Sequence, residues 1–483
     1  MSNDPASKLP EELRRALNDA LVARNAELTR QVQELAERCE AQAKQIEELL
    51  RERNQNSSNS NKPPSSDGLS DRRRIRKGKK PTGRKRGGQP GHKGHSRKLL
   101  PPEEVNEVVN LFPKHCEMCQ QVPPEQPRGE PWVHQVVDLL ADGGGRHVTE
   151  YRCHEVRCTC GEVVAAPSDK VPSSSFGPRL GSAVCALTGN LQLSRRQVVV
   201  ALEELFGISM SLGSVSNIEG RMTQALEAPS DEAMQSAEAA AVKHVDETSW
   251  IRDFERCSVW VFATMLVSVF RIAKNGKRKT LRRLLRRQRG VLVSDRATVF
   301  LYWAMGRRQI CWSHLLRLFI DFSQRDGPAA HLGRELCDSA ELVFLYWRQF
   351  QAKTIARADF VRLVNAVRDG MRPCLERAVC ANIAYVSGSC ANILEHWEAM
   401  WTFVDTPGVS PTNNHAEREL RRLVLWRKRC FGSQSERGDR FVERMMTVTH
   451  SLRKQRRNVL DFLQDCFVAW LDERQPPSLL AVA

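Results

Sequence analysis

The chain has 483 residues, of which 41% are hydrophobic and 27% charged, and its formal net charge is +16. This length favours several domains, and the composition is that of a soluble globular protein with some disordered sequence. The longest apolar run, Val259 to Phe270, is too short to span a bilayer and argues against a membrane protein. The positive charge favours a polyanionic partner, most simply nucleic acid, over a basic protein without such a partner.

The compartment is expected to be reducing. The first 15 residues contain no apolar segment of the kind that directs secretion, so we expect a cytoplasmic protein. Fifteen cysteines in such a chain argue for thiols and metal ligands rather than disulfides.

Residues 9–53 are predicted to form a coiled coil. The segment from Glu11 to Arg53 lacks Pro and Gly, and its apolar residues repeat every seven positions. One seam contains Leu21, Leu28, Leu35, Gln42 and Leu49, and the other contains Asn25, Val32, Cys39 and Ile46. The narrow stripe favours a leucine zipper that joins copies of the chain, and the alternative is one amphipathic helix packed on its own protein.

Residues 54–100 are predicted to be a flexible basic linker. Asn54 to Gly68 is low in complexity, and Arg72 to Lys98 is rich in Lys and Arg without the apolar content needed to fold alone. Arg84, Lys85 and Arg86 are expected to bind DNA in a narrow minor groove. The alternative is a solvated or localisation-type basic tail.

Residues 101–172 are predicted to form a zinc-binding domain. Cys116 and Cys119 precede two strand-like segments, and Cys158 and Cys160 follow them. Two pairs of thiols around a small sheet suit a structural tetrahedral Zn²⁺ site. The second pair is tighter than usual, so Cys153, His154 and His115 are spare ligands, and unrelated free cysteines are the alternative.

Residues 175–235 are predicted to form a helical unit that resembles a helix-turn-helix. A helix ends at a turn around Gly207, and a second helix begins near Ser211. In a DNA-reading unit Ser214, Ser216 and Asn217 would face the bases. A plain helical hairpin in a core is the alternative.

The rest of the chain predicts a ribonuclease H-like core. A strand ends at Asp246, an antiparallel pair spans Val259 to Ala273, a basic helix spans Lys277 to Arg289, and a further strand ends at Asp295. We expect a first part of the core at 240–323, a helical insertion at 324–404, a second part at 405–440 and a helical C-terminal tail at 441–483.

Three acids in this core suit two-metal chemistry on phosphodiesters. Asp246 and Asp295 follow apolar strands that can converge at one edge of a sheet, and Glu417 lies near the start of a helix. Carboxylates that bridge and flank two Mg²⁺ ions, with Mn²⁺ as a substitute, neutralise the crowded anionic transition state. The alternative for any one acid is an ordinary surface carboxylate. Basic residues expected to hold the DNA backbone are Arg282, Arg283, Arg418 and Arg421.

The chain resembles DDE transposases of the insertion-sequence-66 family. The resemblance is carried by HVDETSW, VLVSDR, CWSHLLRLF, NNHAERELR and the run LVLWRKRCFGSQSERGDRFVERMMTVTHSLRKQRRNVLDFL. It also includes the leucine zipper, the GRKRGGQPGHKGH segment and the cysteine pairs, so it covers almost the whole chain. It differs after the second acid, where Arg296, Ala297 and Thr298 replace a glycine and an aromatic residue.

The resemblance implies roles for these residues. Asp246, Asp295 and Glu417 match the family's metal-binding acids, and Cys311-x-x-His314 matches a motif that could support the site or simply pack. The implied activity is cleavage at the ends of a transposon and transfer of a 3′ hydroxyl into target DNA, with accessory transposition proteins in some elements. The implied location is the bacterial nucleoid.

The sequence therefore predicts a multidomain α/β protein with a ribonuclease H-like core and a helical insertion, preceded by coiled-coil, zinc-binding and helix-turn-helix-like units. We expect an oligomeric DNA transposase with two Mg²⁺ and a structural Zn²⁺. Two alternatives stay open: a nuclease of the same fold that cuts without joining, and a DNA-binding regulator with an inactive core.

Overall fold

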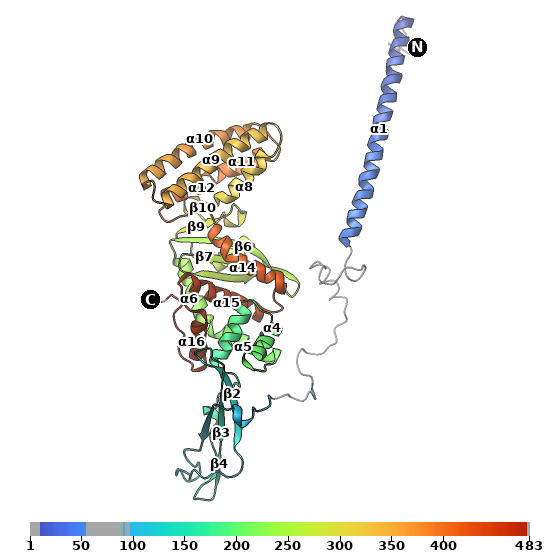
Figure 1. Ribbon diagram of the computed structural model, residues 1–483. Coiled ribbons are helices and arrows are strands. Elements are labelled where there is room, and N and C mark those ends of the chain that lie inside the picture. The colour runs from blue at the N-terminus through green and yellow to red at the C-terminus, as the bar shows by residue number, and fades with distance from the viewer. Residues whose placement is uncertain (1–9, 55–89, 92–96, 481–483) are drawn as a thin grey trace. The chain divides into compact units, whose positions relative to one another are not determined.

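The computed structural model describes residues 10–54, 90–91 and 97–480 (Figure 1). The chain divides into two compact units, Met1–Lys93 and Gly94–Ala483. The predicted DNA contacts Arg84, Lys85 and Arg86 lie outside the described residues. Among the helices of the described parts, none is both long enough and apolar enough to cross a membrane.

The first unit contains one long helix, α1, which spans Glu11–Asn54. Its sequence is free of helix breakers, as expected, and the helix occupies the segment predicted for the zipper. The seam leucines Leu21, Leu28, Leu35 and Leu49 are 42–58% exposed. Because an isolated apolar stripe is costly in water, this exposure fits a helix that needs a partner.

The second unit begins with small sheets. The first sheet has the order β1-β3-β2, with β1 (Glu107–Leu111) parallel and β2 (Trp132–Leu139) antiparallel to β3 (Arg146–Cys153). A separate hairpin pairs β4 (Glu155–Arg157) with β5 (Val163–Ala165). Two 3₁₀ turns flank these strands, η3 at Pro102–Glu104 and η4 at Ser168–Lys170.

Helices follow in the predicted positions. They are α3 (Pro178–Cys185), the π-turn η5 (Ala186–Asn190), α4 (Arg195–Phe206), α5 (Leu212–Ala225) and α6 (Glu227–Ala239). Ser194 and Gln197 form a capping box that starts α4, and Gly207 ends it with a φ of +60°, which suits glycine. Helix α5 contacts α3, α15 and α16. It is therefore part of a shared core rather than an independent module.

The central sheet has five strands in the order β10-β9-β6-β7-β8. They are β6 (Val242–Arg252), β7 (Glu255–Ala263), β8 (Ser268–Ala273), β9 (Val291–Ser294) and β10 (Arg308–Ile310). The first three strands are antiparallel, and β6, β9 and β10 run parallel. The basic helix α7 (Arg278–Leu284) joins β8 to β9 and buries Leu281. Two 3₁₀ turns, η6 (Thr298–Phe300) and η7 (Met305–Arg307), precede β10, which was not predicted from the sequence.

Asp246 does not end its strand, which corrects the prediction from the sequence. Strand β6 continues to Arg252 because it pairs with β7 along its whole length. Its parallel pairing with β9 stops at His244, opposite Val293. Asp246 therefore lies beyond the end of its parallel neighbour, at the same edge as Asp295.

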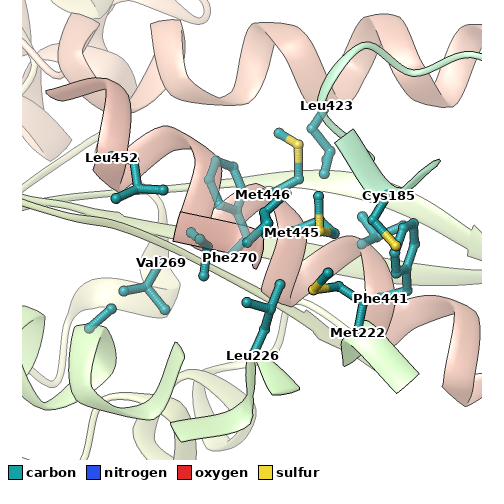
Figure 2. Close-up of a cluster of buried hydrophobic side chains, with 14 of the residues drawn as sticks. Cys185, Met222, Leu226, Val269, Phe270, Leu423, Phe441, Met445, Met446 and Leu452 are labelled. Atoms are coloured by element: carbon teal, nitrogen blue, oxygen red, sulfur yellow. The ribbon is translucent and has the colours of Figure 1, made fainter. Parts of the chain in front are cut away.

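Three helices complete this part of the fold: α14 (Asn414–Cys430), α15 (Glu436–Lys454) and α16 (Val459–Leu471). The helical C-terminal tail was expected to begin at residue 441, but α15 begins at Glu436 and is largely buried. Figure 2 shows side chains of α15, among them Met445 and Met446, packed with Phe270 of β8 and Leu423 of α14.

Helix α15 also covers the open edge of the sheet. Its Thr447 hydroxyl accepts from the Phe270 N–H at 3.0 Å, its Ser451 hydroxyl accepts from the Ser268 N–H at 3.1 Å, and its Glu443 carboxylate accepts from the Ile272 N–H. These acceptors lie one helical turn apart and match alternate N–H groups of β8. The edge strand is thus satisfied by side chains instead of by another strand.

The insertion is helical, as predicted. After α8 (Trp312–Ser323) it contains α9 (Pro328–Gln351), α10 (Arg357–Cys380), α11 (Val386–Glu395), α12 (Trp397–Met400) and α13 (Thr402–Asp405). These helices form a second hydrophobic core that includes Val291 and Val293 of β9, whereas Leu292 packs into the first core. Strand β9 therefore lies between two cores.

Candidate active site

The three predicted acids converge at one edge of the central sheet. Asp246 lies on β6, Asp295 directly follows β9, and Glu417 is in the first turn of α14. Burial, together with the charges of Asp295 and Glu417, raises the pKa of Asp246 to about 7, against a 2.8 Å hydrogen bond from the Glu247 N–H. A buried carboxylate with two further acids beside it is a suitable site for cations.

Glu417 is positioned by the residue that starts its helix. The side chain of Asn413 is buried, and its Nδ2 donates to the backbone oxygen of Val245 at 2.9 Å. Its backbone N–H donates to Cys311 Sγ at 3.2 Å. The start of α14 is therefore tied both to the residue before Asp246 and to the residue before α8.

Asp295 is held by a buried arginine that the sequence did not point to. Arg308 Nη2 donates to the backbone oxygen of Asp295 at 3.2 Å, and the Ala297 N–H donates to the Asp295 carboxylate at 3.0 Å. Arg308 is fully buried, and burial lowers its pKa to about 10. In the sequence, Arg308 is one charged residue at the start of a three-residue strand, and this pattern is too weak to interpret.

The unusual residue after the second acid faces the insertion. Arg296 Nη1 donates to Asn392 Oδ1 of α11 at 3.2 Å. Burial lowers the pKa of Arg296. The residue that departs from the family pattern therefore contacts the helical insertion.

Cys311 and His314 lie beside Glu417. One ligand atom of each of the three residues falls within 4.8 Å of the others. His314 Nδ1 is 3.7 Å from Glu417 Oε1, and Arg317 Nη2 is 3.9 Å from the same oxygen. Burial lowers the pKa of His314 and raises that of the Cys311 thiol. Cys311 thus contacts Asn413, which starts the helix of Glu417, and His314 lies beside the Glu417 carboxylate.

A buried polar network lies behind the acids, and sequence reasoning missed it. The rings of His244 and His415 stack at 5.1 Å, and Lys454 Nζ is 2.7 Å from His415 Nε2 and 3.5 Å from Glu419 Oε1. Burial opposes ionisation of Glu419, yet a hydrogen bond from His450 and the charge of Lys454 hold its pKa down to about 2. The network ties α14 to both β6 and α15.

The predicted basic contacts fall into two separate hollows. Arg418 and Arg421 line a groove of about 930 Å³ together with Asp246 and Glu417. Arg282 and Arg283 line another hollow of about 910 Å³ beside Thr298. The structure therefore brings the α14 arginines to the acids and places the α7 arginines in a different depression.

The four predicted zinc ligands meet in one cluster. Cys116 Sγ is 3.7 Å from Cys160 Sγ, Cys119 Sγ is 3.5 Å from Cys158 Sγ, and all four sulfurs lie within 4.8 Å. A tetrahedron with Zn–S bonds of 2.3 Å has sulfurs about 3.8 Å apart, so the set fits Zn²⁺. A hydrogen bond from the Cys160 N–H lowers the pKa of Cys158 to about 6, whereas contact with Cys158 raises that of Cys119 to about 12 against a backbone hydrogen bond from Gln121. The thiols therefore share protons that a bound Zn²⁺ would displace.

The spare ligands are occupied elsewhere or stand apart. His154 Nε2 is 2.9 Å from Asn110 Oδ1, and its ring stacks on Phe112 at 4.6 Å. Cys153 is buried in β3 and lies outside the cluster of four.

The expected DNA-reading residues of α5 are only partly available. Ser214 bonds to Ser211 at 2.9 Å, and Ser216 Oγ accepts from Arg437 at 2.5 Å, whereas Asn217 is exposed. The start of α5 therefore faces α15.

Two family profiles match the chain. Residues 3–98 match a family of unknown function, DUF6444. Among curated proteins, no match to this chain is found. Residues 174–440, more than half of the chain and including all three acids, match the profile described as Transposase IS66 family. The chain therefore belongs to the IS66 family of transposases.

Proposed function

We propose that this transposase is a DDE enzyme that cleaves the ends of its insertion sequence and joins the freed 3′ hydroxyls to target DNA. The observation that carries the proposal is the placement of Asp246, Asp295 and Glu417 at one edge of the central sheet, where burial and the charges of the other two acids raise the pKa of Asp246 to about 7. The strand order, three antiparallel strands followed by two parallel ones, supports a ribonuclease H-like core.

Each acid has a distinct place in this mechanism. Two Mg²⁺ or Mn²⁺ ions bound by Asp246, Asp295 and Glu417 would supply Lewis acidity and an activated oxygen nucleophile. Asp246, whose pKa is raised by the charges of both other acids, would be a ligand of both ions. Arg418 and Arg421 line the same groove and would hold the phosphates in line without competing as ligands.

Two structural features support the expected accessory parts. The four clustered thiols would bind one Zn²⁺ that stabilises the small sheets. The exposed leucine stripe of α1 would pair with another copy of the chain and so bring two DNA ends into one complex.

The test uses full-length protein and DNA that carries the ends bounding its own gene, with Mg²⁺ or Mn²⁺. Wild type should give nicks with 3′ hydroxyls and products joined to target DNA. Asp246→Ala should give neither while it still binds DNA, and Glu247→Gln, a change at the exposed neighbouring acid, should keep both activities. Full cleavage by Asp246→Ala would show that the catalytic assignment is wrong.

The same assay separates the alternatives. A wild type that cuts but never joins is the nuclease. A wild type that binds the ends without cutting them is the regulator.

A further inference from the structure

A second basic groove lies between α5 and α15, and it shares no lining residue with the groove at the acids. Its volume is about 940 Å³. Helix α5 contributes Asn217, Arg221 and Gln224, which fall on one helical face because they are spaced by four and three residues. The facing wall, from α15, contains Arg437, Arg440 and Arg444.

Most of the positive charge in this groove lacks a counter-charge. Within the described parts of the chain, the guanidinium groups of Arg221 and Arg440 have no carboxylate partner within 4.0 Å and no hydrogen bond to another residue. Arg437 donates only to oxygens of Ser216, at 3.0 Å to the carbonyl and 2.5 Å to the hydroxyl. Three guanidinium groups therefore face the groove without an acid.

The acids that line the groove do not neutralise those arginines. Glu227 accepts from Arg444, and Glu436 is 3.5 Å from Arg252. Of the four arginines in the groove, Arg444 alone has an acidic partner, so an anion that enters the groove meets donors with unused hydrogen-bonding capacity.

We propose that this groove binds the phosphodiester backbone of DNA at a position separate from the scissile phosphate. Arginine is the side chain best suited to phosphate oxygens, which it can contact through two N–H groups at once. The concave site between two helices suits a backbone strand. A recognition helix inserted into the major groove would instead need the start of α5 free, and Arg437 occupies Ser216 there.

The proposal assumes that DNA is the partner but does not depend on cleavage. Binding is measured by fluorescence anisotropy with full-length protein and no added Mg²⁺ or Mn²⁺, on three probes: a duplex from the element end, a scrambled duplex and a single strand. The variant is Arg221→Ala with Arg440→Ala. The matched control is Arg362→Ala with Arg372→Ala, which removes the same charge from α10, where both arginines already have acidic partners at 3.1 and 3.0 Å.

Loss of two phosphate contacts should reduce the slope of log Kobs against log salt by about 1.8. An increase from 50 to 200 mM salt should then weaken the wild-type complex about 12-fold more than the variant complex. The change should be equal on the two duplexes, because backbone contacts carry no sequence information. Arg221→Lys with Arg440→Lys should keep the wild-type slope, which separates lost charge from misfolding.

Three results would overturn the proposal: an unchanged slope in the alanine variant, an equal change in the α10 control, or a loss limited to one duplex sequence. A reduced salt slope of the alanine variant on the single strand alone would support phosphate binding in this groove and would show that the groove binds unpaired DNA. Binding is measured without divalent metal and without cleavage, so a failure of the catalytic proposal leaves this result readable.

Discussion

Replacing Asp246 with asparagine should abolish cleavage and, at the same time, stabilise the metal-free protein at alkaline pH. The carboxyl group of Asp246 titrates near 7 in the folded chain instead of near its ordinary value of 3.8, first because it is buried and then because Asp295 and Glu417 repel its charge. At about 1.4 kcal/mol per pK unit, the upper limit of the destabilisation is about 4 kcal/mol. Partial exposure of the side chain reduces the expected effect to about 1–3 kcal/mol.

The direction of the pH dependence follows from proton binding. Between about pH 4 and pH 7 the folded chain holds a proton on Asp246 that the unfolded chain releases, so the free energy of unfolding falls as pH rises through this window. Asparagine cannot ionise, and the Asp246→Asn variant lacks this dependence. Its advantage should be absent below about pH 4 and complete above about pH 7. Cations bound by the three acids should restore the stability of the wild-type protein but should not stabilise the Asp246→Asn variant.

The assay is urea unfolding followed by tryptophan fluorescence at about pH 5 and about pH 8, with and without Mg²⁺. Trp250 and Trp260 are buried in the central sheet and report on it directly. Glu247→Gln removes a neighbouring exposed acid that contributes less to the pKa of Asp246 than Asp295 and Glu417 do, so it should reduce the pH dependence only slightly. If Asp246→Asn is no more stable than wild type at about pH 8 without metal, burial and the charges of Asp295 and Glu417 do not raise the pKa of Asp246 as argued.

Three further predictions concern other parts of the chain. Lys454→Met should lower the free energy of unfolding by about 3–5 kcal/mol in a denaturation assay, because it leaves the buried Glu419 carboxylate without its cation. Glu419→Gln in the same chain should recover most of that loss. A double variant no more stable than Lys454→Met would refute this reason. Cys158→Ser should release the zinc measured in the purified protein by elemental analysis, whereas Cys153→Ser, a buried thiol outside the cluster, should retain it; equal zinc in both variants would contradict the ligand set. Leu35→Glu in the seam of α1 should shift the molar mass in light scattering toward that of one chain, and an unchanged mass would show that α1 does not hold copies together.

The sequence predicted the elements that a local pattern specifies. The breaker-free repeat of α1, the paired cysteines and the apolar strand before Asp295 each contain their signal within a few residues. The position of Asp246 was harder, because the length of β6 is set by its pairing with β7 and not by the residues that follow the acid.

Features that depend on distant partners could not be read from the sequence. Strand β10 is three residues long and exists because β9 pairs with it. Helix α15 reads as an ordinary amphipathic segment, and only the fold reveals that its Thr447 and Ser451 complete the edge of β8. Arg308 belongs to the same class, since its role arises from its contact with the Asp295 backbone.

Strand β9 has a mechanical consequence for the site. Its Leu292 packs into the core that contains β6, and its Val291 and Val293 pack into the core of the helical insertion. Arg296, directly after Asp295, is bonded to α11 of that insertion. Strand β6 also touches that core through Val242, but in the described chain only Asp295 has a neighbouring residue bonded to the insertion, so a shift of the insertion would act on Asp295 through two routes. A displacement of the insertion would therefore change the separation between Asp295 and Asp246, although the insertion contains neither acid.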